Sequence, residues 1–249
     1  MKSKKKKTKK KSKATTRKRS KPMQEETQLV RKPEAPIVAQ DANEWGAPEL
    51  SASDVVIPKL FLMQKMSKGV DEKLAKEGEY LDSLSKKSLG ASFVAVPFFL
   101  QKTQHVHFWE GRERKWAEER PAPAGAKNFE KETVDGVDVE RTLVFNFHVL
   151  LPGSSLPHIV SFKGTSIRAG KELATQMYFA NGSAHLPPWE YSVEVSSSPV
   201  DGEKGKYFVS NVKVSKKSTD HEKAEASKWL GLVRSGQVRS QGYEEVFSE

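Results

Sequence analysis

Two long segments of the chain alternate apolar and polar positions at the spacing of a β-strand. The segment Ser92–Trp109 is apolar on both faces at its start and becomes half polar from Gln101 onward. In the segment 137–151, Leu143 and Phe145 begin an apolar face that continues at every second residue. A strand with two apolar faces is typical of a sheet covered on both sides. The pattern therefore predicts two long strands at the centre of a β-rich domain.

Shorter segments complete the predicted element order. Segments with strand character lie at 55–62, 78–90, 159–162, 189–195 and 207–214. Pro58 interrupts the first of these, which favours an edge strand or a kinked segment. Helical spacing predicts a helix over 167–177, where Ser166 can serve as the N-cap, and a second helix is expected at about 219–233.

This order predicts a mainly β fold, namely an OB-like antiparallel barrel with one helix between its third and fourth strands. We divide the chain into a disordered polybasic tail (1–22), a linker (23–53), the OB-like domain (54–218) and a C-terminal helix with an acidic, aromatic tail (219–249). The charged, Pro- and Gly-containing residues 110–136 are expected to form a long loop inside the domain.

Charge separates the N-terminal tail from the rest of the chain. The first 22 residues carry thirteen basic side chains and no acidic one, while the whole chain has 42 basic and 32 acidic residues. The remaining residues 23–249 therefore hold 29 basic and 32 acidic side chains, a balance of −3. A flexible polycation beside a near-neutral body suits loose, sequence-independent contact with phosphates. The lysines that we expect to make this contact are Lys4, Lys5, Lys6, Lys7, Lys9, Lys10 and Lys11.

Composition limits the other classes. The chain has no cysteine, which excludes disulfides and thiolate metal sites, and it has no apolar run long enough to span a membrane. We expect a cytoplasmic protein without a cofactor, located in the host cytoplasm for a viral protein. Arg17-Lys18-Arg19 in its lysine context also fits a nuclear import signal. Assembly into an oligomer is left open.

Aromatic and basic side chains accompany each other on the predicted strands, a combination that grips unpaired bases and their phosphates. Trp109 and Trp116 are the preferred stacking residues because they lie among charged residues, where a core ring is less natural. Phe145 and Phe147 continue an apolar face and are more simply explained as core. The cations expected to follow the phosphates are Lys102, Arg141, Lys163, Arg168 and Lys171.

The segment 161–171 has the composition of a phosphate-binding loop but not its spacing. Five residues separate Gly164 from Gly170, and Glu172 follows Lys171, whereas a Walker A motif has four residues between its glycines and Ser or Thr after its lysine. Nucleotide hydrolysis is therefore rejected. The start of the predicted helix can still attract one phosphate group, or it can be an ordinary capped helix.

No constellation of residues indicates an enzyme. His105 and His107 would share a strand face, but no third ligand is placed by spacing, and no HExxH or Gly-x-Ser-x-Gly motif occurs. The carboxylates between Glu110 and Glu119 intermix with basic residues, as on a solvated surface. We therefore predict no catalytic residue and no metal site.

The stretch from Leu156 to Phe179, LPHIVSFKGTSIRAGKELATQMYF, resembles phage-encoded proteins found among single-stranded-DNA-binding and recombination-accessory proteins. The resemblance implies an OB-type DNA-binding protein that works with phage replication or recombination enzymes. Such proteins often end in an acidic, aromatic tail, which Tyr243–Glu249 resembles in part, and this tail would contact those enzymes.

The preferred interpretation is sequence-independent binding of single-stranded DNA, with RNA as an alternative ligand. The competing interpretation is a structural or packaging protein, in which the lysine tail neutralises nucleic acid or an anionic partner while the β domain assembles.

Overall fold

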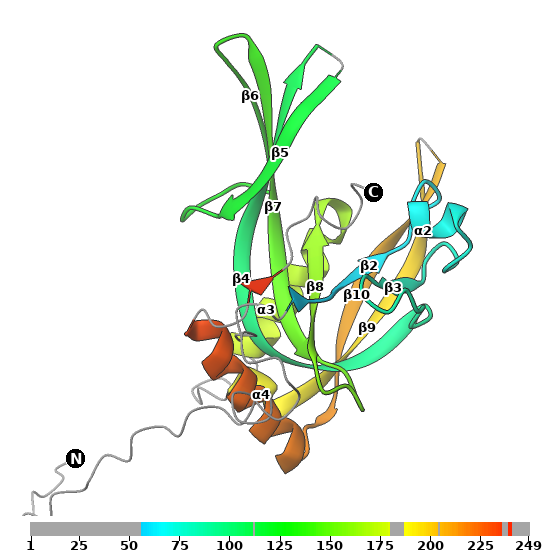
Figure 1. Cartoon of the computed structure of the whole chain (residues 1–249), viewed down its shortest axis with the longest axis vertical. Coiled ribbons are helices and arrows are strands. Elements are labelled where there is room, and N and C mark those ends of the chain that lie inside the picture. The colour runs from blue at the N-terminus through cyan, green and yellow to red at the C-terminus, as the bar shows by residue number, and fades with distance from the viewer. Residues whose placement is uncertain (1–55, 112, 180–186, 204, 236–238, 241–249) are drawn as a thin grey trace, which may run out of the picture. The chain divides into compact units, whose positions relative to one another are not determined.

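The computed structural model describes residues 56–111, 113–179, 187–203, 205–235 and 239–240 (Figure 1). The predicted basic tail (1–22), the linker (23–53) and the acidic, aromatic residues 241–249 lie outside the described residues.

The described chain is mainly β, with few helices. The strands are β1 (Val56–Ile57), β2 (Lys59–Leu62), β3 (Tyr80–Asp82), β4 (Ser92–Glu110), β5 (Glu113–Pro121), β6 (Phe129–Val134), β7 (Val137–Leu150), β8 (Pro157–Lys163), β9 (Tyr191–Gly202), β10 (Gly205–Lys217) and β11 (Arg239–Ser240). The helices are α2 (Lys68–Asp71), α3 (Ile167–Phe179) and α4 (Asp220–Arg234), with 3-10 turns η2 (Gly164–Ser166) and η3 (Pro188–Glu190). Both long strands and both predicted helices are confirmed.

The main sheet is open and mixed. Its strand order is β10-β9-β4-β7-β8-β2-β3, with β5 paired to β4 and β6 paired to β7. The pair β2–β8 is parallel, as is the small separate pair β1–β11. The helix α3 lies between β8 and β9 in the chain. The OB-like closure that the sequence predicted is not confirmed, because no backbone ladder joins β10 to β8, β2 or β3 within the described residues.

The strand β4 connects the two parts of the sheet. Its first residues, Ser92–Ala95, pair with β9, and the rest of the strand pairs with β7 and β5. Figure 1 shows β4 as one long, strongly curved strand. A register shift between Pro97 and Phe99 marks a bulge, which bends a strand and adds local twist. The curvature lets one strand serve both parts of the sheet.

Three apolar clusters lie among the described residues, and the two larger ones pack on the sheet around α3 and under α4. The first includes Phe147, Phe162 and Leu173, and the second packs Trp229 of α4 against Phe98 of β4. The helix α3 approaches the sheet closely at Gly170, where a Cβ atom would lie 2.8 Å from the Cβ of Phe162. This agrees with the prediction that a helix face starting at Ile167 is buried.

Side chains join the two ends of the open sheet. The side-chain amide of Gln64 donates to the carbonyl of Phe208 and accepts from its backbone N–H, both at 2.9 Å. The hydroxyl of Tyr80 donates to the Oγ of Ser210 at 2.9 Å and contacts the carbonyl of Ser196 at 3.2 Å. Burial raises the pKa of Tyr80 to about 12, against the opposing effect of the Ser210 hydrogen bond. These contacts hold β10 near the β2–β3 region without a ladder.

Three local expectations need correction. Residues 110–136 hold the strands β5 and β6 rather than a long loop, and these strands extend the sheet along β4 and β7 (Figure 1). Pro58 separates β1 from β2, so the kinked interpretation holds, but β2 lies between β8 and β3 and is not an edge strand. Ser166 lies in η2, where its Oγ accepts the backbone N–H of Ser210 at 3.0 Å instead of capping α3.

Candidate nucleic-acid interface

A cleft of about 1480 Å³ lies where the open sheet leaves β10 unpaired with β8. Four parts of the chain line it. They are residues 59–68 of β2 and the following turn, residues on β4 and β7, the end of β8 with η2, and residues 206–210 of β10. Segments far apart in the sequence therefore form one surface.

The residues that line this cleft are rich in cations and aromatic rings. The lysines are Lys59, Lys65, Lys68, Lys163 and Lys206, and the rings are His105, His107, Phe61, Tyr207 and Phe208. Among the described residues that line the cleft there is no aspartate or glutamate. In a chain with 32 acidic residues, this composition favours an anionic ligand.

Two lining residues, Lys59 and His105, belong to a largely buried polar network built around Glu119, which does not itself line the cleft. The carboxylate of Glu119 lies 3.5 Å from Nζ of Lys59 and 3.6 Å from Nε2 of His105. It also accepts hydrogen bonds from the hydroxyl of Thr103 at 2.7 Å and the side-chain amide of Asn146 at 2.8 Å. The side chain of Lys59 is only 4% exposed. Because buried charges need several partners, this network holds β5, β4, β7 and β2 together.

Electrostatics within the network follow from burial and charge. Burial alone would raise the pKa of Glu119, but the hydrogen bond from His105 and the charge of Lys59 outweigh it and lower the pKa well below its usual range. Burial lowers the pKa of the His105 imidazole, against the opposing hydrogen bond to Glu119. Glu119 is therefore a carboxylate at neutral pH, and its charge faces Lys59 rather than the cleft.

The structure brings one of the predicted cations, Lys163, into the cleft. The predicted pair His105 and His107 also lines it, with ring centroids 6.5 Å apart on one strand face. Thr165 and Ser166, at the start of the predicted helix, belong to the same surface.

The predicted stacking residues lie on the β4–β5 extension and do not line the cleft. Trp116 stacks on Phe108 across the strands, with ring centroids 3.6 Å apart and planes at 10°, and is 50% exposed. Trp109 is half-buried, and its indole Nε1 has no hydrogen-bond partner among the described residues. Trp109 lies at the end of β4, as the sequence predicted, and Trp116 lies on β5 rather than in a loop; their role in binding stays a prediction.

The other predicted cations are distributed over the sheet and α3. The guanidinium of Arg141 pairs with Glu132 at 2.6 Å, and that of Arg168 pairs with Glu172 at 2.8 Å. Nζ of Lys102 lies 5.5 Å from the ring centroid of Phe145. Lys171 is exposed on α3. None of these four lines the cleft.

Sequence reasoning missed most of the cleft. Lys206, Tyr207 and Phe208 form one wall, and the turn that contains Lys65 and Met66 forms another. The run Lys-Tyr-Phe at the start of a predicted strand places a cation next to two aromatic rings. This pattern is the sequence feature that could have indicated a stacking surface here.

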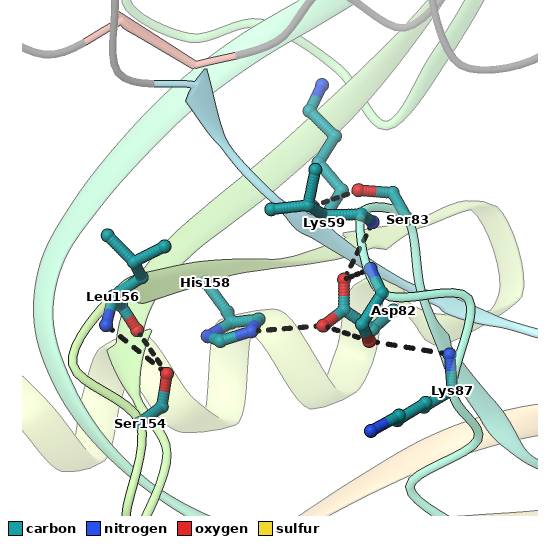
Figure 2. Close-up of polar contacts among 9 residues, drawn as sticks. Lys59, Asp82, Ser83, Lys87, Ser154, Leu156 and His158 are labelled. Carbon is teal, nitrogen blue, oxygen red and sulfur yellow. Dashed lines mark hydrogen bonds and ion pairs between the residues drawn. The ribbon is translucent and has the colours of Figure 1, made fainter.

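A buried Asp–His pair lies beside β2 but does not form a catalytic triad. Figure 2 shows His158 directed at Asp82, with Nε2 and Oδ2 3.3 Å apart. Asp82 also accepts from the backbone N–H of Leu84 and the hydroxyl of Ser85. The nearby Ser154 donates its hydroxyl to the carbonyl of Leu156 and makes no drawn contact with His158. The pair therefore fixes the turn after β3 against β8.

No group of three or more His, Asp or Glu side chains in the part of the chain that the structure describes is arranged to hold a metal ion. None of the helices in that part of the chain is both long and apolar enough to cross a membrane.

A β-rich protein with a cationic, aromatic cleft is the class that the fold and the site define. The Pam3 phage gp34-like protein family matches residues 24–239, and the chain belongs to this family. The phage origin implied by the resemblance of residues 156–179 is thereby confirmed. Neither the curated proteins nor the solved structures contain a match.

Proposed function

We propose that this protein binds single-stranded DNA without sequence preference and supports phage DNA replication or recombination. The observation that carries the proposal is the cleft, where Lys65, Lys163 and Lys206 accompany aromatic rings and no aspartate or glutamate is among the described lining residues. The other two lysines of the lining are paired, Lys59 with Glu119 and Lys68 with Glu72. Cations along a groove follow the phosphates, and rings stack on bases of any sequence.

The position of the cations favours a polymer over a single small anion. Lys65 belongs to the turn after β2, Lys163 ends β8, and Lys206 starts β10, so the charges come from three separate walls. A ligand with one phosphate group would contact the lysine of only one wall. A nucleic-acid strand, with a phosphate at every nucleotide, can contact the lysines of all three walls.

The rings favour an unpaired strand. Phe61, Tyr207 and Phe208 are half-buried aromatic residues of the cleft lining. In a duplex the faces of the bases are already stacked on one another, whereas in a single strand they can stack on protein rings. RNA offers the same faces and is tested as an alternative ligand.

Two features outside the cleft support the same function. The thirteen basic side chains of residues 1–22 would add salt-sensitive, sequence-independent affinity and accelerate capture. The phage family is consistent with a role in phage DNA metabolism. The other residues that we propose as contributors to binding are Lys102, Trp109, Trp116, Arg141, Arg168 and Lys171.

Fluorescence anisotropy of the full chain with labelled 20-nucleotide oligo-dT, the matching RNA and a duplex tests the proposal at several salt concentrations. Lys206→Glu removes a cation of the cleft, and Lys213→Glu makes the same charge change on the same strand outside the cleft. Both side chains are exposed, so neither substitution disturbs the core.

We expect Lys206→Glu to weaken binding to oligo-dT and to lower the slope of log affinity against log salt by about 0.7–1, as for one lost phosphate contact. Lys213→Glu is expected to change both much less. Equal effects of the two variants would contradict the cleft as the binding site. Affinity that disappears with residues 1–22 and ignores Lys206 would favour the packaging alternative.

A further inference from the structure

The turn after β2 exposes an apolar side chain at the cleft. Met66 is 90% exposed, the highest value among the large apolar side chains that the structure describes, and it lines the cleft. Gly, Pro, Asn, Asp and Ser are the usual residues at the centre of a tight turn. This turn has Lys65 and Met66 there instead, between Gln64 and Ser67.

The turn is fixed in place by four hydrogen bonds. The backbone N–H of Ser67 donates to the carbonyl of Gln64 at 2.9 Å, and the backbone N–H of Gln64 donates to Oγ of Ser67 at 2.9 Å. The side chain of Gln64 makes two more, one in each direction, with the backbone of Phe208. Met66 is therefore presented by a pre-organised support, which limits the entropy lost when a ligand binds.

The surroundings of Met66 indicate what it would contact. The turn is anchored to β10, where Tyr207 and Phe208 supply rings, and Lys65 precedes Met66 directly. A ligand that suits this corner has a flat apolar face for Met66 and a neighbouring phosphate for Lys65. A methionine thioether packs favourably against aromatic faces.

We propose that the turn Gln64–Ser67 is the base-contacting element of the cleft, with the Met66 thioether packed on an unpaired base and Lys65 beside the adjoining phosphate. This inference rests on the proposed single-strand binding. It adds that contact with Met66 makes the protein bind a strand with bases more tightly than a bare sugar-phosphate chain, whichever bases the strand carries.

The test uses the full chain labelled with methyl-13C methionine. The chain has five methionines, of which Met63 and Met177 are buried and serve as internal references. On titration with oligo-dT we expect the Met66 methyl signal to shift upfield through the ring current of a base. An oligomer of abasic sites of equal length should bind without this shift. A Met66 signal that responds equally to both ligands, or to neither, would overturn the inference.

A variant pair gives the second measurement. Met66→Gln removes the thioether at similar length, and Leu84→Gln makes a comparable change at a 63% exposed side chain outside the cleft. We expect Met66→Gln to weaken oligo-dT binding about threefold to tenfold and to leave abasic binding unchanged. Leu84→Gln should alter neither. If oligo-dT binding depends on Lys206 but not on Met66, the proposed function stands and this inference fails; if Lys206→Glu has no effect, the proposed function itself fails.

Discussion

The buried ammonium group of Lys59 and the partly buried carboxylate of Glu119 form an ion pair, 3.5 Å apart, that joins β2 to β5. Lys59 follows Pro58 near the start of the described chain, and Glu119 lies in the extension formed by β5 and β6. Thr103 and Asn146 supply further hydrogen bonds to the carboxylate. The pair therefore couples the position of the extension to the wall of the cleft.

Replacing Glu119 by Gln should destabilise the protein strongly. The change leaves the ammonium group of Lys59 buried without its counter-charge, and breaking a buried ion pair from one side costs about 3 kcal/mol or more of the free energy of unfolding. Urea denaturation measures the loss. Glu132→Gln removes the partner of Arg141 in a more exposed pair and should cost about 1 kcal/mol or less. Similar losses for both variants would show that Glu119 has no special structural role.

Stability should fall as the pH drops from about 6.5 to 4.5, because of His148. This side chain is buried beside Phe98 and Phe99. Burial, assisted by the charge of Lys59, lowers the pKa of His148 to about 4. The unfolded chain, with a histidine pKa near 6.5, then binds a proton that the folded chain does not. The full stability is present above pH 6.5 and declines by up to about 1.4 kcal/mol per pH unit below it.

His148→Leu should flatten this slope in urea denaturation between pH 4.5 and 6.5. His105 has a lowered pKa for the same reason and leaves a smaller residual slope. The exposed His221 on α4 supplies the matched change, His221→Leu, which should keep the slope of the unmodified chain. A slope that survives His148→Leu unchanged would contradict the assignment.

Two glycines in helices should respond in opposite directions to alanine. At Gly170 of α3, a Cβ atom would lie 2.8 Å from Cβ of Phe162 and 3.1 Å from Cβ of Phe145, atoms that sit next to the backbone and cannot rotate away. Gly170→Ala should therefore lower the free energy of unfolding by about 1–3 kcal/mol. At Gly231 of α4 nothing lies within 4 Å, and Gly231→Ala should raise it by about 0.5–1 kcal/mol. Thermal unfolding of both variants checks the contrast.

The elements that bury an apolar face could be predicted from the sequence. The strand β7 and the helix α3 each place apolar residues at their characteristic period, and both were found with nearly correct bounds. The strands β5 and β6 were missed because their side chains are largely half-buried or exposed. A strand that buries neither face carries no period-2 signal, and its mixed charges, as at Glu118 and Arg120, are typical of a loop.

The cleft could be predicted only in part, because its walls meet through tertiary contacts. Lys163 was identified as a cation that accompanies aromatic residues on the predicted strands, but the other lysines of the cleft lie about 40 to 100 positions away in the sequence. The link between Gln64 and Phe208 spans 144 residues and uses one side-chain amide. No local pattern marks such a contact. Strand order alone could not show that β10 stays unpaired with β8 and leaves a cleft there.

Deleting residues 1–22 should separate the two proposed sources of affinity. Ammonium groups on a tail contact phosphates of single strands and duplexes alike, so their loss should weaken both and make the salt dependence shallower. Stacking in the cleft acts on unpaired bases only and should persist. We therefore expect the ratio of oligo-dT to duplex affinity to rise after the deletion, and Lys206→Glu to lower that ratio again in the shortened chain. Anisotropy at 50 and 200 mM salt measures both effects. A ratio that falls toward one after the deletion would mean that the tail, not the cleft, distinguishes single strands, and a Lys206→Glu effect of zero there would leave the cleft without a role in binding.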